Sequence, residues 1–528
     1  MAKREQTIIS ALKVLLFKTM GTGLGIVAAL GIAFLFGAGP LMDAYFFARR
    51  LVSNLAALAD RVFETVYVPG LVQLGKSSGL SAVLDATNRI ERICFGFGLI
   101  ACALAILFAP AIVDLAGPGF GAEGRDYAIY FLRLLLVSLP LAIVAGMTSA
   151  TLTSLRAFSL PVIAKLAPRA MVVLALLLVP LGAGLEWAVY GVILGTVFTL
   201  VIVWRASKRL RKSADATPLA SNKRIDAALL ASLAGGWQRN GAILVLSIYF
   251  VVIGLIDMAF ASIAGVGAIA VLALSQRVSN AGAGQISHSF SAVYYTNLSE
   301  QNQASRMDEF KIELSNSIRM SLFFIAPIGF LLAGMAHGIA QLILATGAFG
   351  QDAAALAGSV IAIFALATLV NTVVSCLQTA NLAHPSFPHL TIALASVLVA
   401  ILVRVVLIMF FLDDHGVIAV AWGALGGACA YLAVMSFTVR RVTKFILTAA
   451  DMRAILVILA VGSIVAILSY FGANAVLSLD AHRLVKIMCL GMIAALLGAS
   501  YVLALAAAGL KDAHDVLALP KKVLNRFF

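Results

Sequence analysis

The chain has 528 residues, of which 62% are apolar and only 12% are charged, and its mean hydropathy is +1.03. Soluble proteins carry about 25% charged residues, so this chain lacks the polar groups that would cover a water-facing surface. A soluble enzyme, a disordered protein and a disulfide-stapled secreted domain are therefore excluded. Long continuous apolar runs also argue against a β-barrel, whose strands alternate polar and apolar residues. The composition predicts an all-α polytopic membrane protein.

A spanning helix requires about 20 mainly apolar residues, and this length predicts fourteen transmembrane segments. In chain order the segments are 19–39, 44–74, 93–115, 126–153, 160–181, 186–205, 227–256, 264–297, 316–344, 352–382, 389–411, 417–439, 453–471 and 484–508. An even number of segments places both ends of the chain on the same side of the membrane.

The basic residues of the loops predict the orientation, because cytoplasmic loops are enriched in Lys and Arg. With the N-terminus in the cytoplasm, that side collects 28 Lys and Arg residues, most densely between Arg205 and Arg224, and the opposite side collects three. We therefore expect a multi-pass membrane protein with both termini cytoplasmic. Because most of the net charge of +14 lies in these loops, it does not indicate a nucleic-acid partner.

A weak internal repeat relates two parts of the chain. Arg50, Phe63, Val66 and Tyr67 recur 227 residues later as Arg277, Phe290, Val293 and Tyr294. Gly119-Phe120-Gly121 recurs 229 residues later as Ala348-Phe349-Gly350. Repeats of six spans have the same orientation, so they are related by a pseudo-two-fold axis along the membrane normal, with the substrate site between the two halves.

The repeat predicts two six-helix lobes followed by two C-terminal helices. The expected divisions are an N-terminal lobe (1–212), a cytoplasmic linker (213–226), a C-terminal lobe (227–445), and the last two spans with a cytoplasmic tail (446–528).

Ionisable residues inside apolar segments carry most of the functional information, because each costs roughly 2.5–3.5 kcal/mol at the centre of a spanning helix. Asp43, Arg50, Arg61 and Glu64 fall near one face of a helix with 3.6 residues per turn. That face is expected to contact protein or water rather than lipid. The candidate substrate-binding residues are Arg277, Arg50, Asp43, Arg49, Arg61 and Arg239.

Two interpretations of these arginines stay open. In the first they form an anion site between the lobes, because guanidinium groups bind phosphate bidentately and stay charged in a poorly solvated cavity. In the second they form internal ion pairs, which would join Arg49 or Arg50 to Asp43 and Arg61 to Asp60 or Glu64. Asp257 closes the seventh segment and is either a cation-binding or gating group or an ordinary helix-end carboxylate.

The remaining motifs do not indicate catalysis. The sequence contains no recognisable nucleophile–base pair, metal cluster or nucleotide loop, so we expect neither an enzyme nor a bound cofactor or metal. Gly21, Gly23 and Gly25 have a loose phosphate-loop spacing, but no strand precedes them, and close helix packing explains them better.

Several short motifs, in this order and spacing, resemble a known family. They are Phe36-Gly37-Ala38-Gly39, Asp43-Ala44-Tyr45-Phe46, Val66-Tyr67-Val68-Pro69, Ile256-Asp257-Met258-Ala259-Phe260-Ala261-Ser262, Ser275-Gln276-Arg277 and Gly347-Ala348-Phe349. They resemble motifs of the MurJ/MviN lipid II flippases, which belong to the multidrug/oligosaccharidyl-lipid/polysaccharide (MOP) exporter superfamily. The resemblance covers nearly the whole chain.

The resemblance implies a two-lobed flippase with a central cationic cavity that opens alternately to each side of the membrane. Its substrate would be an undecaprenyl-diphosphate-linked saccharide for peptidoglycan synthesis, and cell-wall or polysaccharide synthesis enzymes would be its natural partners. The last two helices would form a groove for the lipid tail. The eighth-helix arginine of the family corresponds to Arg277, its second-helix aspartate to Asp43, and a basic residue to Arg50.

The chain also departs from the family pattern. Residues 20–38 hold no charge, with Ala28 where a cavity-facing arginine is expected, and Ala56 and Ala57 replace a pair of arginines. Arg49 and Arg61 would compensate. These departures keep two alternatives open, an exporter of an exopolysaccharide or O-antigen lipid-linked unit and a non-transporting membrane scaffold.

The expected mechanism is a clamp. Arg277 and Arg50 would hold the diphosphate while Asp43 holds one arginine until the substrate arrives. The membrane potential or a coupled Na⁺ or H⁺ would supply the energy, at about 2.3 kcal/mol per elementary charge per 100 mV.

Overall fold

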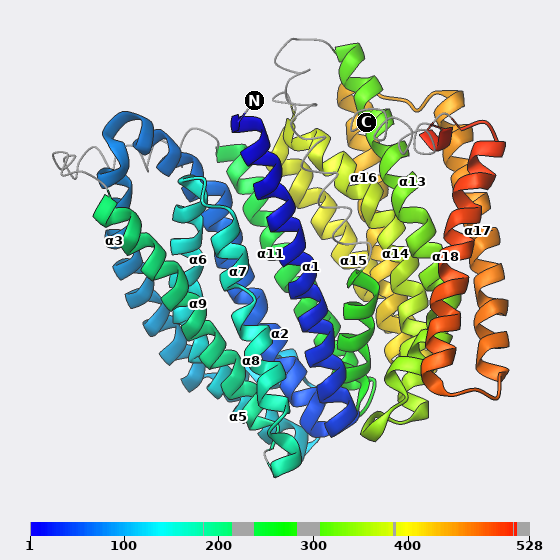
Figure 1. Ribbon diagram of the computed structural model, residues 1–528, viewed down its shortest axis with the longest axis horizontal. Coiled ribbons are helices and arrows are strands. Elements are labelled where there is room, and N and C mark those ends of the chain that lie inside the picture. The colour runs from blue at the N-terminus through cyan, green and yellow to red at the C-terminus, as the bar shows by residue number, and fades with distance from the viewer. Residues whose placement is uncertain are drawn as a thin grey trace. The chain divides into compact units, whose positions relative to one another are not determined.

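All regular secondary structure in the described part of the chain is helical, as expected (Figure 1). The computed structural model describes residues 2–182, 184–213, 237–281, 307–383, 387–510 and 512–514. By its internal packing the chain divides into two compact units, Met1–Ala270 and Val271–Phe528. This division places residues 237–263 in the first unit, and the lobe boundaries expected from the repeat stay a prediction.

The first unit is built from helices of very different lengths. They are α1 (Ala2–Phe36), α2 (Pro40–Val62), α3 (Val68–Leu107), α4 (Ala109–Ala116), α5 (Ala122–Leu136), α6 (Ser138–Ser154), α7 (Ser159–Ala164), α8 (Ala167–Leu176), α9 (Glu186–Ser213) and α11 (Trp237–Ile263), with a further helical segment, 268–281, beginning at its end. A π-helical turn, Phe63–Tyr67, joins α2 to α3.

The junction between α1 and α2 is tight because of its residue types. Gly37 has a φ of 72°, a left-handed conformation that costs glycine little. Pro40 follows at the first position of α2, where its missing N–H leaves no hydrogen bond unmade. The junction therefore turns the chain from α1 into α2 within a few residues.

The first half of α2 is largely buried within the first unit. It packs against α5, α6 and α11, and Tyr45 and Phe47 are almost fully buried. The rings of Tyr45 and Phe131 meet edge to face with centroids 6.1 Å apart. This packing fixes the position of α2, and with it the position of the charged side chains that α2 carries.

The fifth predicted segment, 160–181, is a broken helix. The short α7 ends at Ala164, Lys165 and Leu166 form a turn, and α8 starts at Ala167 with Pro168 in its first turn. Since proline cannot donate a backbone hydrogen bond, a new helix starts there at little cost. Lys165, which the sequence analysis counted among the loop charges, therefore lies at a break inside the segment.

The second unit contains longer and more regular helices. They are α13 (Met307–Ile339), α14 (Gln351–Ala383), α15 (His389–His415), α16 (Val417–Thr443), α17 (Ala449–Ser478) and α18 (Arg483–Ala507). In this unit α13 packs against α14 and α17, α15 against α16, and α17 against α18. The two C-terminal spans are thus anchored mainly on α13.

Twelve helices in the described residues are long and apolar enough to cross a membrane. Two predicted spans are absent from that set for identifiable reasons. The helix α2 carries Asp43, Arg49, Arg50, Asp60 and Arg61, which lower its apolar character. The eighth segment, predicted over 264–297, is described only as far as residue 281. The expected fourteen spans are consistent with this arrangement.

The structure covers the predicted repeat only in part. Gly119-Phe120-Gly121 directly precedes α5, and Ala348-Phe349-Gly350 directly precedes α14, so the second pair of motifs occupies equivalent places. Phe290, Val293 and Tyr294 lie outside the described residues, as do nearly all of the linker 213–226 and the tail after residue 514. The pseudo-two-fold relation stays a prediction.

Candidate functional site

Asp43 on α2 caps the start of the neighbouring helical segment 268–281. Its side chain is buried, and its two carboxylate oxygens accept backbone N–H bonds from Gly267 (2.5 Å) and Ala270 (2.7 Å). These donors lie at the start of the segment 268–281, where the first turn leaves N–H groups without intrahelical partners. A carboxylate is also favoured by the positive end of the helix dipole. The expected partner of Asp43 was an arginine, whereas its observed partners are backbone amides.

Arg50 is joined to α11 through Asp257. The Arg50 Nη2 atom lies 3.5 Å from Asp257 Oδ2, and the side chains are 23% and 2% exposed. One turn earlier on α11, a Cβ at Gly254 would lie 2.5 Å from the amide nitrogen of Asn54. Glycine there lets α11 approach α2 closely enough for the ion pair. Arg50 therefore pairs with Asp257 instead of Asp43. Arg50 was a candidate substrate-binding residue and Asp257 a candidate cation-binding or gating residue, and the two form one ion pair.

Arg49 and Arg61 contact aromatic rings. Arg49 donates a hydrogen bond to the Tyr45 hydroxyl. The Arg61 guanidinium carbon lies 4.4 Å from the centre of the Phe250 ring on α11, a cation–π geometry. Glu64 is close enough to attract Arg61 electrostatically. Neither arginine has a carboxylate within 4.0 Å among the residues that the structure describes, so the interpretation in which they form internal ion pairs is not supported for these two.

Asp60 pairs with the break between α7 and α8. The Lys165 Nζ atom lies 2.8 Å from Asp60 Oδ2. Gly146 of α6 faces the same carboxylate, and a Cβ there would clash with Asp60 Oδ1. One open interpretation of the sequence paired Arg61 with Asp60 or Glu64, whereas Asp60 binds Lys165, which was not a candidate site residue. The sequence did contain a signal for this contact, because Lys165 precedes Arg169 by four residues inside the apolar segment 160–181.

Arg169 crosses the glycine face of α1. A Cβ at Gly21 would lie 2.5 Å from Arg169 Nη1, and one at Gly25 would lie 3.7 Å from its Cδ. Close helix packing is thus confirmed at Gly21 and Gly25, where the packing partner is a cationic side chain, whereas a Cβ at Gly23 would meet no neighbouring atom within 4 Å. The Arg169 side chain is not covered by other parts of the described chain, and it is close enough to Arg49 for the two charges to repel. This residue was also missed in the sequence.

These side chains form one charged group within the first unit, which we term the α2 polar cluster. Its members are Arg49, Arg50, Asp60, Arg61, Glu64, Lys165, Arg169 and Asp257. Five of these residues are cationic and three are acidic. Uncompensated charge in a membrane protein is costly and faces a protein interior or a water-filled cavity. The cluster is therefore suited to an anionic ligand.

Arg277 belongs to the segment 268–281 and is partly buried. Ser275 and Ser279 of this segment donate hydrogen bonds to the carbonyls of Ala357 (3.3 Å) and Ile361 (3.4 Å) on α14. At 100° per residue, Arg277 projects from the opposite face of the helix. Because Arg50 and Arg277 lie in different units, the clamp that they were expected to form stays a prediction. The side chain of Arg239 lies outside the described residues.

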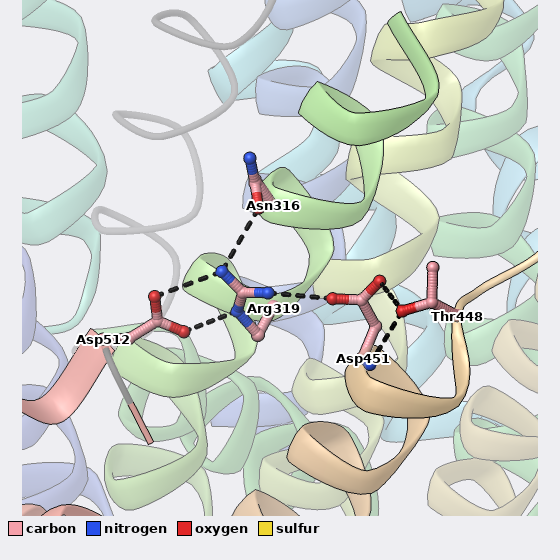
Figure 2. Close-up of polar contacts among 5 residues, drawn as sticks. All are labelled: Asn316, Arg319, Thr448, Asp451 and Asp512. Carbon is pink, nitrogen blue, oxygen red and sulfur yellow. Dashed lines mark hydrogen bonds and ion pairs between the residues drawn. The ribbon is translucent and has the colours of Figure 1, made fainter. Parts of the chain in front are cut away.

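A second charged cluster lies in the second unit and was also missed. Arg319 of α13 binds Asp512 (2.6 and 3.3 Å), Asp451 of α17 (2.8 Å) and the side-chain oxygen of Asn316 (3.2 Å) (Figure 2). Thr448 caps α17 by accepting the Asp451 N–H. The three charged side chains are only 10–23% exposed. We term this group the Arg319 cluster, and its pairing joins α13 to α17 and to the segment after α18.

The described ranges contain no group of three or more His, Cys, Asp or Glu residues that could hold a metal ion. The charged groups in the two described clusters are guanidinium, ammonium and carboxylate groups.

Comparison with known proteins identifies the family. A model of the lipid II flippase MurJ family matches residues 32–514. A probable lipid II flippase MurJ of Rhizobium meliloti (strain 1021) is 23% identical over 365 residues, which cover 66% of this chain and 65% of the relative.

Solved structures show the same fold. A lipid II flippase MurJ in an inward closed conformation aligns with a TM-score of 0.69 and 17% identity, over 94% of this chain and 98% of that one. An inward-facing multidrug resistance MATE family transporter of the MOP superfamily aligns with a TM-score of 0.65 and 13% identity, over 82% of this chain and 96% of that one. With its apolar helices and this match over most of its length, the chain is a multi-pass bacterial inner-membrane protein that belongs to the lipid II flippase MurJ family.

Proposed function

We propose that this protein is a flippase that moves an undecaprenyl-diphosphate-linked saccharide of the lipid II type from the inner to the outer leaflet of the membrane. Family membership supports the class of substrate. The observation that carries the proposal is the excess of positive charge in the α2 polar cluster. A diphosphate is an anion that guanidinium groups bind with paired, charge-assisted hydrogen bonds.

The members of the cluster would have different tasks. Arg49, Arg61 and Arg169 have no carboxylate partner within 4.0 Å among the described residues, so they would attract the diphosphate. The 3.5 Å contact between Arg50 and Asp257 is long for an ion pair. Substrate would compete with Asp257 for Arg50. Asp257 would thus hold the arginine until substrate arrives, a role that was expected of Asp43.

The cycle would follow alternating access. Arg277 would supply the second arm of the diphosphate clamp, and the two lobes would rock about the site. When substrate takes Arg50, Asp257 would be released to accept a proton or a Na⁺ ion, which would couple transport to an ion gradient. Alternatively, the membrane potential would act directly on the charges that move.

Complementation tests this function. The resident lipid II flippase of a bacterial host is depleted, and growth is scored with the wild-type chain and with Arg50→Ala, Arg277→Ala and Arg440→Ala. Arg440 is an exposed residue in the last turn of α16 and serves as a matched control. We expect rescue by the wild type and by Arg440→Ala alone. Equal rescue by all variants would refute the clamp, and failure of a membrane-inserted wild-type chain would refute lipid II as the substrate.

A second candidate is export of an exopolysaccharide or O-antigen lipid-linked unit. The uncharged stretch 20–38 favours it, because a site with a different set of cations would suit a different saccharide. Rescue of a strain that lacks its polysaccharide-unit exporter, without rescue of the lipid II depletion, would select this candidate. A chain that rescues neither strain, yet is needed to hold synthesis enzymes in place, would be a scaffold.

A further inference from the structure

A pocket of about 530 Å³ opens between α3, α6 and α9 in the first unit. It is lined by Asn88, Glu91, Arg92 and Phe95 of α3, Val144 of α6, and Leu200, Val201 and Trp204 of α9. The helices α3 and α9 each pack along α6 but contact each other little, so a groove remains above Val144. None of these residues belongs to the α2 polar cluster.

The lining changes from polar to apolar along the groove. The part of α3 that is long and apolar enough to cross a membrane starts at Ala82, and that of α9 ends at Leu210. We infer that Asn88 and Trp204 both lie near one membrane surface. Phe95 and Leu200 lie one to two turns deeper in the apolar region. Tryptophan favours this interfacial depth because its ring is apolar and its N–H is polar. The groove thus has the polarity of a lipid, with a polar head and an apolar tail.

The polar end carries two cations. Arg92 is exposed and has no ion-pair partner in the described ranges. Lys208 lies one turn beyond Trp204, with its Nζ 3.6 Å from the centre of the Trp204 ring, so it is held at the rim by a cation–π contact.

The carboxylate of the pocket lies against its inner wall. Glu91 Oε1 is 2.5 Å from the hydroxyl oxygen of Thr148, and Thr148 is fully buried in α6. The hydrogen bond holds the acidic group against α6, away from Lys208 at the rim. Two cations against one carboxylate leave the polar end with net positive charge.

We propose that this pocket binds an anionic glycerophospholipid. Its phosphodiester would lie between Arg92 and Lys208, and one acyl chain would cover Phe95 and Leu200. Basic pockets between transmembrane helices recognise anionic headgroups in this way, through charge at the surface and apolar contact below it. Phe95 and Trp204 are 40% and 45% exposed, so an acyl chain would cover apolar surface that a free phosphate ion would leave open.

Native mass spectrometry of the purified full-length protein tests the site, with phosphatidylglycerol and phosphatidylcholine as probes. We expect phosphatidylglycerol to bind more tightly, and the double variant Arg92→Gln/Lys208→Gln to weaken it about tenfold or more, since hydrogen bonds to charged groups contribute about 1.5–3 kcal/mol. Arg440→Gln/Arg441→Gln removes the same charge at the end of α16 and is expected to have no effect. Equal binding of both lipids, or equal loss in both double variants, would overturn the proposal.

Fluorescence gives a second measurement that does not depend on those variants. Phosphatidylglycerol with brominated acyl chains quenches a tryptophan that it contacts. At a low mole fraction in phosphatidylcholine nanodiscs, we expect it to quench the wild type more than brominated phosphatidylcholine does, and Trp204→Phe to abolish this difference. A difference that persists in Trp204→Phe places the lipid elsewhere. Preferential quenching by brominated phosphatidylethanolamine would instead indicate a zwitterionic lipid bound through Glu91 and would overturn the anionic assignment.

Discussion

The two charged clusters of this protein differ in how completely their charges are matched. In the Arg319 cluster, one arginine binds two carboxylates at 2.6 and 2.8 Å and an amide oxygen at 3.2 Å. In the α2 polar cluster, five cations face three carboxylates, and Arg50 lies 3.5 Å from Asp257. Matched charges with short contacts join helices, whereas an excess of one sign remains available to a ligand.

The difference suggests a way to separate structural from functional charges in a membrane protein. Breaking a matched, partly buried pair leaves a charge without its partner and destabilises the fold. Removing a cation that has no carboxylate partner relieves repulsion among its neighbours and leaves the fold nearly unchanged. The two clusters are therefore expected to respond oppositely when stability and transport are measured together.

The largest effect on stability is expected for Arg319→Ala. This change leaves Asp451 and Asp512 without their shared cation, at a cost of about 3 kcal/mol in the free energy of unfolding. Thermal unfolding in detergent measures it, with Arg441→Ala at the exposed end of α16 as the control. An unfolding temperature equal to that of the control would show that the cluster does not anchor α17.

Asp43→Ala is expected to have a smaller effect, because the helix start at Gly267 and Ala270 loses its acceptors. The loss of a helix cap costs about 1–2 kcal/mol. Asp43→Asn keeps a side-chain oxygen and is expected to recover part of it. Hydrogen exchange of the amides in 268–281 locates the effect, and unchanged protection in Asp43→Ala would contradict the capping role.

For Arg61→Ala we expect loss of transport with little loss of stability. Its contact with the Phe250 ring is worth about 0.5–1 kcal/mol at an exposed site. Complementation and thermal unfolding are measured on the same variant. A fall in stability as large as that of Arg319→Ala would place Arg61 among the structural charges and remove the contrast between the clusters.

The smallest effect is expected for Lys165→Ala. The pair that it forms with Asp60 is 47% and 28% exposed, and exposed pairs contribute about 0–1 kcal/mol. Because salt screens exposed pairs, the difference in unfolding temperature from wild type is expected to shrink in high salt. A difference that is large and insensitive to salt would mean that the pair is shielded from solvent.

The sequence predicts the helices well and their charge pairs poorly. Hydrophobic length is a local property, so the predicted spans 389–411 and 417–439 agree closely with α15 and α16. The pairing of Arg50 with Asp257 joins residues 207 positions apart, and no local pattern specifies which helices meet. For the same reason the sequence offered only the neighbouring Arg61 as a partner for Asp60, although Lys165 in the turn between α7 and α8 binds it.

Three basic residues, Lys165, Arg319 and Arg169, were missed because of the sequence around them. Lys165 and Arg319 lie near the ends of predicted spans, where basic residues are common and usually indicate orientation. Only packing shows that Lys165 faces Asp60 and that Arg319 faces Asp451. Arg169 was missed because residues 20–38 hold no charge, yet Gly21 and Gly25 in this stretch leave room for a cation from α8.

The most direct test of the account is the affinity of the purified protein for undecaprenyl diphosphate in wild type, Arg169→Gln and Arg440→Gln. If the unmatched cations of the α2 polar cluster bind the diphosphate, Arg169→Gln weakens binding about tenfold, with an unchanged unfolding temperature, and Arg440→Gln binds as wild type does. Equal affinity in all three proteins would contradict the claim that the excess positive charge of this cluster serves the ligand.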